Sequence, residues 1–148
     1  MLSNPNVLFS MVVPIVSSQW HFYRCEQPVF ALPDTPVMFA PHSIMLALSP
    51  YLLLEVVAVR EQTMDRCIVH NLLHKSKIRE YRRRAINNTF KELICASREI
   101  AAEYSATCEW TERVRMISQK TEVSNLVMEA DVGQMSLLRT FLATVKPR

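Results

Sequence analysis

The chain has 148 residues, of which 49% are hydrophobic and 21% charged, a composition that supports one domain with a real core and excludes disorder. Its single glycine, Gly133, excludes the Gly-rich phosphate loops of P-loop nucleotidases and Rossmann proteins. The net charge of +3 divides into −2 over residues 1–59 and +5 over residues 60–148. We therefore predict one domain over residues 1–148, with an apolar, strand-rich part at 1–60 and a helical part at 61–148.

The first apolar segments carry no charged side chain before Arg24. Residues 7–16 are apolar and rich in β-branched side chains, which predicts a buried strand or a short helix. The aromatic residues of 20–25 favour a strand. An uncharged start also suits a signal peptide, but no cation precedes the apolar run and no A-x-A-like site follows it, so export is not expected.

The next apolar segments are divided by prolines. Residues 29–32 and 37–40 flank the four residues 33–36, Pro-Asp-Thr-Pro, which is the pattern of two short strands joined by a turn that the Asp closes. Residues 43–59 predict a strand, a turn at Ser49-Pro50 and then a second strand or short helix. The uncharged run 35–54 has membrane-spanning length, but its three prolines would break such a helix, so we expect no membrane segment.

From Glu61 onward the apolar residues recur mostly at spacings of three to five, with cations between them, which is typical of amphipathic helices. We predict helices over 61–74, 76–105, 108–119 and 121–145. Strands followed by helices indicate an α+β fold, with a small, mainly antiparallel sheet and three to four helices packed against one face. The four cysteines form no C-x-x-C pair, so we expect a reduced, cytoplasmic protein.

Three short motifs follow one another between residues 20 and 90. They are Phe30, Asp34, Pro36 and Val37, then Leu48, Ser49 and Pro50, then Val69 and Asn71. In this order they resemble an uncharacterised, mainly bacterial family, the domain of unknown function numbered four-two-three-eight. Pro33 and Thr35 stand where that family has Ser and Asn. The resemblance implies that the chain corresponds to the C-terminal half of such a domain, and it implies no activity.

Asp34 and Glu55 are the first candidate site. Each lies at the edge of an apolar segment, as do the carboxylates of P-D…(D/E)-x-K nucleases, which hold the Mg²⁺ that activates water. Val57 stands where that pattern has its Lys, although Lys75 or Lys77 could reach in from the following helix. The alternative is an Asx-type turn at Asp34 and a Glu55 that lies at the surface or faces a helix.

Cys67, His70 and His74 are a second candidate site. On a helix these residues would share one face, and a Cys with two His can bind zinc. A fourth ligand would have to come from elsewhere in the chain, with His42, His21 and Cys25 as the candidates. The tight paired spacing of structural zinc sites is absent. The alternative is one buried thiol with two half-buried, hydrogen-bonded imidazoles.

Residues 74–84 form a basic segment, with six Lys or Arg and one acid. Such a stripe can contact nucleic-acid phosphates, contact an acidic protein, or simply be solvated. Its cations are Lys75, Lys77, Arg79, Arg82, Arg83 and Arg84.

The C-terminal helix carries a wide apolar stripe, which would pack on the chain's own core or form a protein interface. Its candidate interface residues are Leu126, Met135, Leu138, Phe141 and Leu142.

Together these features predict a non-enzymatic protein-interaction module, which acts as an oligomer or as a subunit of a larger complex. The apolar stripe and the basic helix would be its contact surfaces. The alternative is a nucleic-acid-binding protein, with a divalent-metal nuclease or defence-linked toxin as its enzymatic form. In that form Asp34 and Glu55 would hold Mg²⁺, whereas the interaction module needs no cofactor.

Overall fold

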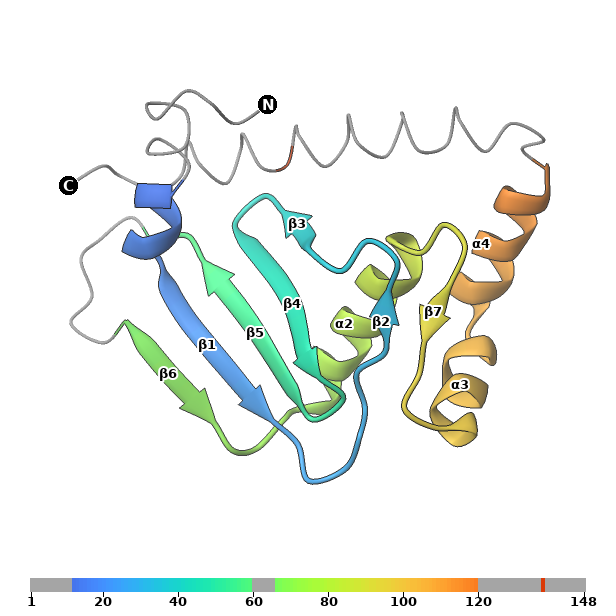
Figure 1. Cartoon of the computed structure of the whole chain (residues 1–148), viewed down its shortest axis with the longest axis horizontal. Helices are drawn as coiled ribbons and strands as arrows, with labels where there is room; N and C mark the ends of the chain where they lie inside the picture. Colours follow the sequence, from blue (N-terminus) through green and yellow to red (C-terminus); the bar gives the residue numbers. More distant parts are fainter. Residues whose placement is uncertain (1–11, 60–65, 120–136, 138–148) are drawn as a thin grey trace.

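The computed structural model describes residues 12–59, 66–119 and 137, and they form an α+β fold, as predicted (Figure 1). A five-stranded sheet comes first in the chain and most of the helical residues follow it. The strands and helices are β1 (Gln19–Arg24), β2 (Leu32–Pro33), β3 (Met38–Ala40), β4 (Ser43–Ser49), β5 (Leu52–Val57), β6 (Cys67–His70), α2 (Lys75–Asn87), β7 (Leu93–Ile94), α3 (Arg98–Ser105) and α4 (Cys108–Gln119).

The large sheet has the strand order β3-β4-β5-β1-β6, and all its neighbours are antiparallel except β1 and β6. Strand β1 therefore lies between β5 and β6, with Phe22 opposite Leu54 on one side and Val69 on the other. The predicted turn at Ser49-Pro50 joins β4 to β5. The small sheet pairs β2 with β7, so the two strands predicted on either side of Asp34 belong to different sheets.

One face of the large sheet packs on α2, which lies behind the sheet in Figure 1. Side chains alternate along a strand, so Met45 of β4 and Leu53 of β5 point to this face together. Both are fully buried, and they belong to one core with Tyr81 and Ala85 of α2. The predicted packing of a helix against one face of the sheet is therefore what the structure shows.

Two buried tyrosines tie the helices to the segment before β2. The Tyr81 hydroxyl on α2 donates to the carbonyl oxygen of Ala31 (2.5 Å). The Tyr104 hydroxyl on α3 donates to the carbonyl oxygen of Val29 (3.2 Å) and accepts from the N–H of Ala31 (3.2 Å). This segment lies outside any strand, so the tyrosines supply the partners that its buried backbone needs.

The other face of the large sheet carries a second, smaller core. Ile44 and Val56 are buried there against Ile15, Trp20 and partly buried neighbours. Ile15 belongs to residues 12–17, which are helical, and its carbonyl oxygen accepts from Trp20 Nε1 (3.1 Å). Of the two alternatives for residues 7–16, the structure therefore shows the short helix from residue 12 onward.

Two helix predictions are wrong and one is confirmed. In the range 61–74 the described residues contain strand β6 and no helix, because Cys67–His70 pairs with β1. The single helix predicted over 76–105 is divided into α2 and α3 with β7 between them. Helix α4 spans 108–119 as predicted, whereas the helix predicted over 121–145 lies outside the described residues except for Leu137. None of the helices in the described ranges is long and apolar enough to cross a membrane.

Candidate functional site

Asp34 joins two distant parts of the chain. Its carboxylate accepts from the N–H groups of Phe90 (2.9 Å) and Lys91 (2.8 Å), and its own N–H donates to the carbonyl oxygen of Glu92 (3.1 Å). The prediction that the Asp34 side chain closes a local turn is therefore wrong. Its partners are backbone amides far along the chain, at Phe90 and Lys91, and not amides of the turn itself. Residues 90–92 follow α2, so the carboxylate holds the start of β7 against the end of β2.

Replacing Asp34 with Ala is expected to lower the free energy of unfolding by about 1–2 kcal/mol, because two backbone donors lose a charged acceptor at an exposed position. Asp34→Asn keeps one acceptor and should lose less. Urea denaturation measures both changes, and Glu92→Ala, which removes a neighbouring exposed acid, is the matched control. Equal stability of Asp34→Ala and Glu92→Ala would contradict this structural role.

Glu55 is the centre of a polar network between the sheet and α2. Its side chain is buried on β5, and Oε2 accepts from the Tyr23 hydroxyl (3.0 Å) and from Lys77 Nζ (3.1 Å). Lys77 also donates to Glu80 (2.9 Å), which Arg84 contacts from the next turn of α2. Lys77 thus reaches Glu55 from the helix, but Asp34 is held separately by the backbone of residues 90 and 91.

The pKa shifts in this network keep its groups in their usual charge states at neutral pH. Burial and then the charge of Glu55 raise the pKa of the Tyr23 hydroxyl. Burial opposes the Lys77 ammonium, but hydrogen bonds to Glu80 and Glu55 outweigh it and raise the Lys77 pKa. Burial likewise opposes ionised Glu80, yet the Lys77 hydrogen bond and the Arg84 charge leave its pKa lowered. Tyr23 and Lys77 therefore stay protonated at neutral pH, and Glu80 stays ionised.

The residues of the predicted zinc site are not brought together. Cys67 and His70 stand three positions apart in strand β6, so their side chains point to opposite faces of the sheet, and His74 follows the strand in a loop. Among the residues that the structure describes, no group of three or more His, Cys, Asp and Glu side chains is placed to hold a metal ion. Helical spacing was the wrong basis for this prediction, because the segment is a strand.

Helix α2 divides its six cations into two groups. Lys77, Arg82 and Arg84 each form an ion pair with a glutamate. Lys75, Arg79 and Arg83 are exposed, stand four residues apart, and form no ion pair within the described part of the chain. We call these three residues the cation row. Four residues of helix rise by about 6 Å, so the row presents a regular line of charge.

An open cavity of about 300 Å³ lies beside the cation row. Arg79, Arg82 and Arg83 of α2 line it together with Thr107 and Glu109, where α4 begins. The Arg82 guanidinium is held over the Tyr104 ring (5.3 Å) and paired with Glu103. We call this the arginine cavity. Its lining carries three cations against one acid, Glu109. A backbone hydrogen bond, more than any other cause, lowers the pKa of Glu109, and the charge of Arg83 adds a smaller effect.

The five predicted interface residues, Leu126, Met135, Leu138, Phe141 and Leu142, lie outside the described residues. Their role in a protein interface therefore stays a prediction.

Comparisons of the chain with protein-family models, with curated proteins and with solved structures give no match. The resemblance to the domain of unknown function numbered four-two-three-eight therefore stays a prediction. The segments that carry it do come close in space, because Phe30 and the run Leu48-Ser49-Pro50 line one apolar cavity of about 260 Å³.

One residue of the predicted zinc site, His70, does lie beside His21, which was one of the possible fourth ligands of that site. His21 of β1 and His70 of β6 have ring nitrogens 2.9 Å apart (Nδ1 to Nε2), and Gln19 contacts the far nitrogen of His21. The alternation of Gln19, His21 and Tyr23 along a strand was a usable signal, since it places all three on one face of the sheet. The pairing of β1 with β6 brings His70 to them, and no local pattern indicates it.

Proposed function

We propose that the chain is a non-enzymatic binding module, and that the cation row of α2 contacts the phosphate groups of a nucleic acid. The observation that carries this proposal is the division of charge on α2. The chain neutralises the cations that face its own core and leaves Lys75, Arg79 and Arg83 exposed. Exposed arginines suit phosphate, because the guanidinium offers a planar pair of donors.

The start of α2 supports an anionic partner. The preceding residue, His74, makes no side-chain capping bond, and the first turn contains no acid. It contains Lys75 and Lys77 instead, although cations are unfavourable at the positive end of the helix dipole. A helix optimised only for stability would carry acidic residues, not lysines, in its first turn. The backbone N–H groups of the first turn and Lys75 would attract the same anion.

The arginine cavity gives the cation row a place for a phosphate group. Arg79 and Arg83 belong to both features, so the cavity opens where the row presents two of its three charges. Arg82 is oriented there by Glu103 and the Tyr104 ring. A phosphate that enters the cavity would meet donors from two successive turns of one helix. Glu109 opposes such an anion, so binding would depend on the three arginines together.

A binding role rather than a catalytic one is supported by the charge states of the reactive groups. Lys77 and Tyr23 hold their protons more tightly than usual, and burial raises the pKa of the Cys25 and Cys95 thiols. Asp34 is bonded to two backbone amides instead of sharing a metal site with Glu55. The predicted protein interface is a separate proposal, since its apolar stripe lies outside the described residues.

Charge reversal of the cation row is expected to weaken nucleic-acid binding about tenfold or more at low salt, and to flatten its salt dependence, because three phosphate contacts are lost. Fluorescence anisotropy with labelled single-stranded and duplex oligonucleotides, titrated at several salt concentrations, compares the natural chain with the variant Lys75→Glu, Arg79→Glu and Arg83→Glu.

The control variant is Lys91→Glu, Arg98→Glu and Arg115→Glu, which reverses three other exposed cations and changes the net charge by the same amount. It should retain most of the affinity. Equal losses in both variants would mean that net charge alone attracts the nucleic acid. A natural chain that binds neither oligonucleotide at low salt would refute the proposal and leave an acidic protein as the partner to test.

A further inference from the structure

The two edges of the large sheet differ in how well they are protected. At one edge β3 has only three residues and lies between Pro36 and Pro41. At the other edge β6, Cys67–His70, contains no proline and no Lys, Arg, Asp or Glu (Figure 1). Short length, prolines and charges are the usual means of keeping an edge strand from pairing with another chain. In the described part of the chain no strand pairs with the outer side of β6, so this edge is open.

The pairing of β6 with β1 shows which backbone groups point to the open edge. The N–H of Trp20 donates to the carbonyl oxygen of Arg66 (2.6 Å), and the parallel register places Trp20 opposite Cys67. Backbone groups alternate in direction along a strand, so those of Arg66 and Ile68 face β1. The N–H and carbonyl groups of Cys67 and Val69 therefore point away from the sheet.

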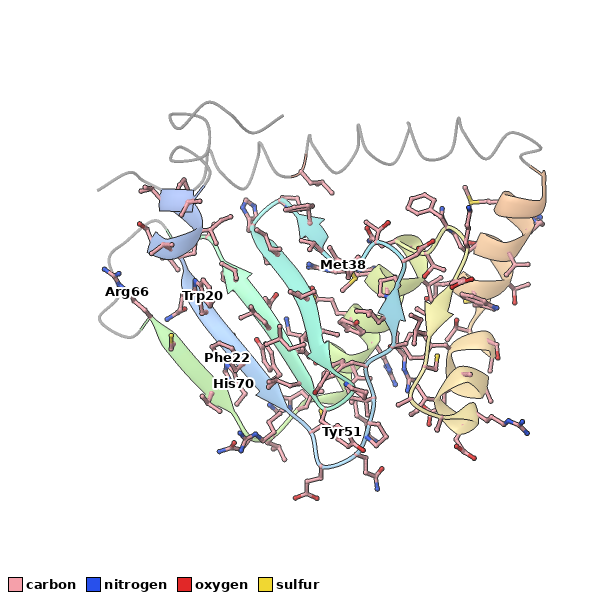
Figure 2. All side chains as sticks on the ribbon, in the orientation of Figure 1. Trp20, Phe22, Met38, Tyr51, Arg66 and His70 are labelled. Atoms are coloured by element: carbon pink, nitrogen blue, oxygen red, sulfur yellow. The ribbon has the colours of Figure 1, made fainter. Side chains whose placement is uncertain are left out.

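The open edge also carries exposed apolar side chains. Val69 is 59% exposed, and Leu72, just after the strand, is 77% exposed. Val69 lies opposite Phe22 of β1, which lies opposite Leu54 of β5, so an apolar row crosses three strands and ends at this edge. Figure 2 shows Phe22 beside β6, with Arg66 and His70 at the two ends of that strand. Free backbone groups and apolar side chains together make β6 a template for one more strand.

We propose that β6 of a second copy of this chain is that strand, antiparallel to the first, with a two-fold axis at Ile68. Cys67 of each copy then lies opposite Val69 of the other, and each of these two pairs exchanges two backbone hydrogen bonds. The four outward backbone groups of each copy are all satisfied. The five strands of one copy continue into the five of the other, and α2 of both copies lies on the same face.

Three features favour a second copy over another partner. Only the axis at Ile68 pairs Cys67 and Val69 within the strand, since an axis at either neighbour would leave one of them outside it. The pairing brings no like charges together, because Arg66 of the two copies lies at opposite ends of the paired strands, about 14 Å apart along them. The protected edge at β3 stops further addition, so the contact closes as a dimer and does not grow into a fibre.

Sedimentation equilibrium of the full chain, with reducing agent and without nucleic acid, tests the proposal independently of the proposed phosphate contact. The mass should rise with concentration from 17.1 kDa toward twice that value. Val69→Pro removes only a donor of the open edge, because the Val69 N–H does not face β1, and it should weaken the dimer about tenfold or more. Val69→Lys should act in the same way. The matched control is Val114→Lys, at a valine of α4 that is 44% exposed, and it should leave the dimer unchanged.

A cross-link tests the position of the axis. The background variant, Cys67→Ser with Cys108→Ser, removes the two exposed thiols. Adding Ile68→Cys places two thiols in a pair that exchanges no backbone bonds, where Cα atoms about 4.5 Å apart allow a disulfide. Mild oxidation should then give a covalent dimer. Leu72→Cys in the same background is the control and should not cross-link, because the two Leu72 positions lie at opposite ends of the paired strands.

Three outcomes overturn the proposal. The first is a natural chain that stays at 17.1 kDa at every concentration. The second is a dimer that both Val69 variants retain at full strength while circular dichroism shows them folded, because the copies would then meet through another surface. The third is Leu72→Cys cross-linking as readily as Ile68→Cys, which would mean that the thiols react by random collision.

Discussion

Replacing Lys77 with Met is expected to lower the free energy of unfolding by about 2–4 kcal/mol, because it leaves the Glu55 carboxylate buried without its cation. The Glu55 side chain is 6% exposed, so water cannot replace the lost partner, and the Tyr23 hydroxyl alone remains as donor. The loss should be smaller than for a fully buried pair, since the Lys77 side chain is 23% exposed. Urea denaturation measures the change.

Two further variants separate the ion pair from other causes. Lys75→Met removes the exposed, unpaired lysine two positions earlier and should change stability by about 0.5 kcal/mol or less. The double variant Glu55→Leu with Lys77→Met removes both charges and should recover most of the stability, because no buried charge is left without a partner. If Lys77→Met cost no more than Lys75→Met, the network around Glu55 would not hold α2 on the sheet.

The variant Tyr104→Phe is expected to lower the free energy of unfolding by about 2–4 kcal/mol. The Tyr104 hydroxyl satisfies both the carbonyl oxygen of Val29 and the N–H of Ala31, and its removal leaves these two backbone groups without their partner. Ala31 and Tyr104 are almost completely buried, so water does not reach them readily. Burial, more than any other cause, raises the Tyr104 pKa to about 12, which keeps the hydroxyl protonated.

Thermal and urea denaturation test this prediction, with Tyr51→Phe as the control. Tyr51 lies at the turn between β4 and β5 and is 47% exposed, so loss of its hydroxyl should change stability by about 0.5 kcal/mol or less. Figure 2 shows Tyr51 at the end of the sheet where β4 turns into β5. Similar stability of Tyr104→Phe and Tyr51→Phe would mean that the segment before β2 does not depend on the tyrosine hydroxyl.

Hydrophobic pattern and local capping account for the parts of the fold that were predicted correctly. The order of apolar strands and then helices follows from the change of period near Glu61. Helix α4 begins and ends where the pattern predicts, and the Thr107 hydroxyl accepts from the N–H of Trp110 at its start (3.3 Å). These features depend on neighbours in sequence, which a pattern can reveal.

The incorrect predictions involve partners that are distant in sequence. Cys67–His70 becomes a strand because β1 pairs with it, and nothing in its four residues requires this. The division between α2 and α3 had weak local signals. The run Asn87-Asn88-Thr89 ends the first helix, and Ser97 caps the second by accepting from the N–H of Ile100 (3.3 Å). Apolar residues at helical spacing continue through the division, so periodicity alone missed it.

The candidate sites show the same difference. The cations of α2 were predicted because they lie close together in sequence. The pairing of Arg84 with Glu80 is also local to the helix, but Glu55 and Glu103, which pair with Lys77 and Arg82, come from other elements. The partners of Asp34 and the contact of His21 with His70 also require the folded chain. A local pattern can name the residue types of a site, whereas its pairing depends on the strand order.

The central position of β1 has a consequence for the order in which the chain can fold during synthesis. This aromatic strand leaves the ribosome first, yet its two neighbours begin only at Leu52 and Cys67. At about 5–20 residues per second, β1 stays without either partner for a time on the order of seconds. Once β5 has been synthesised, it can form a hairpin with β4, its neighbour in sequence, and β1 must then pair with the free edge of β5 before β6 completes the sheet.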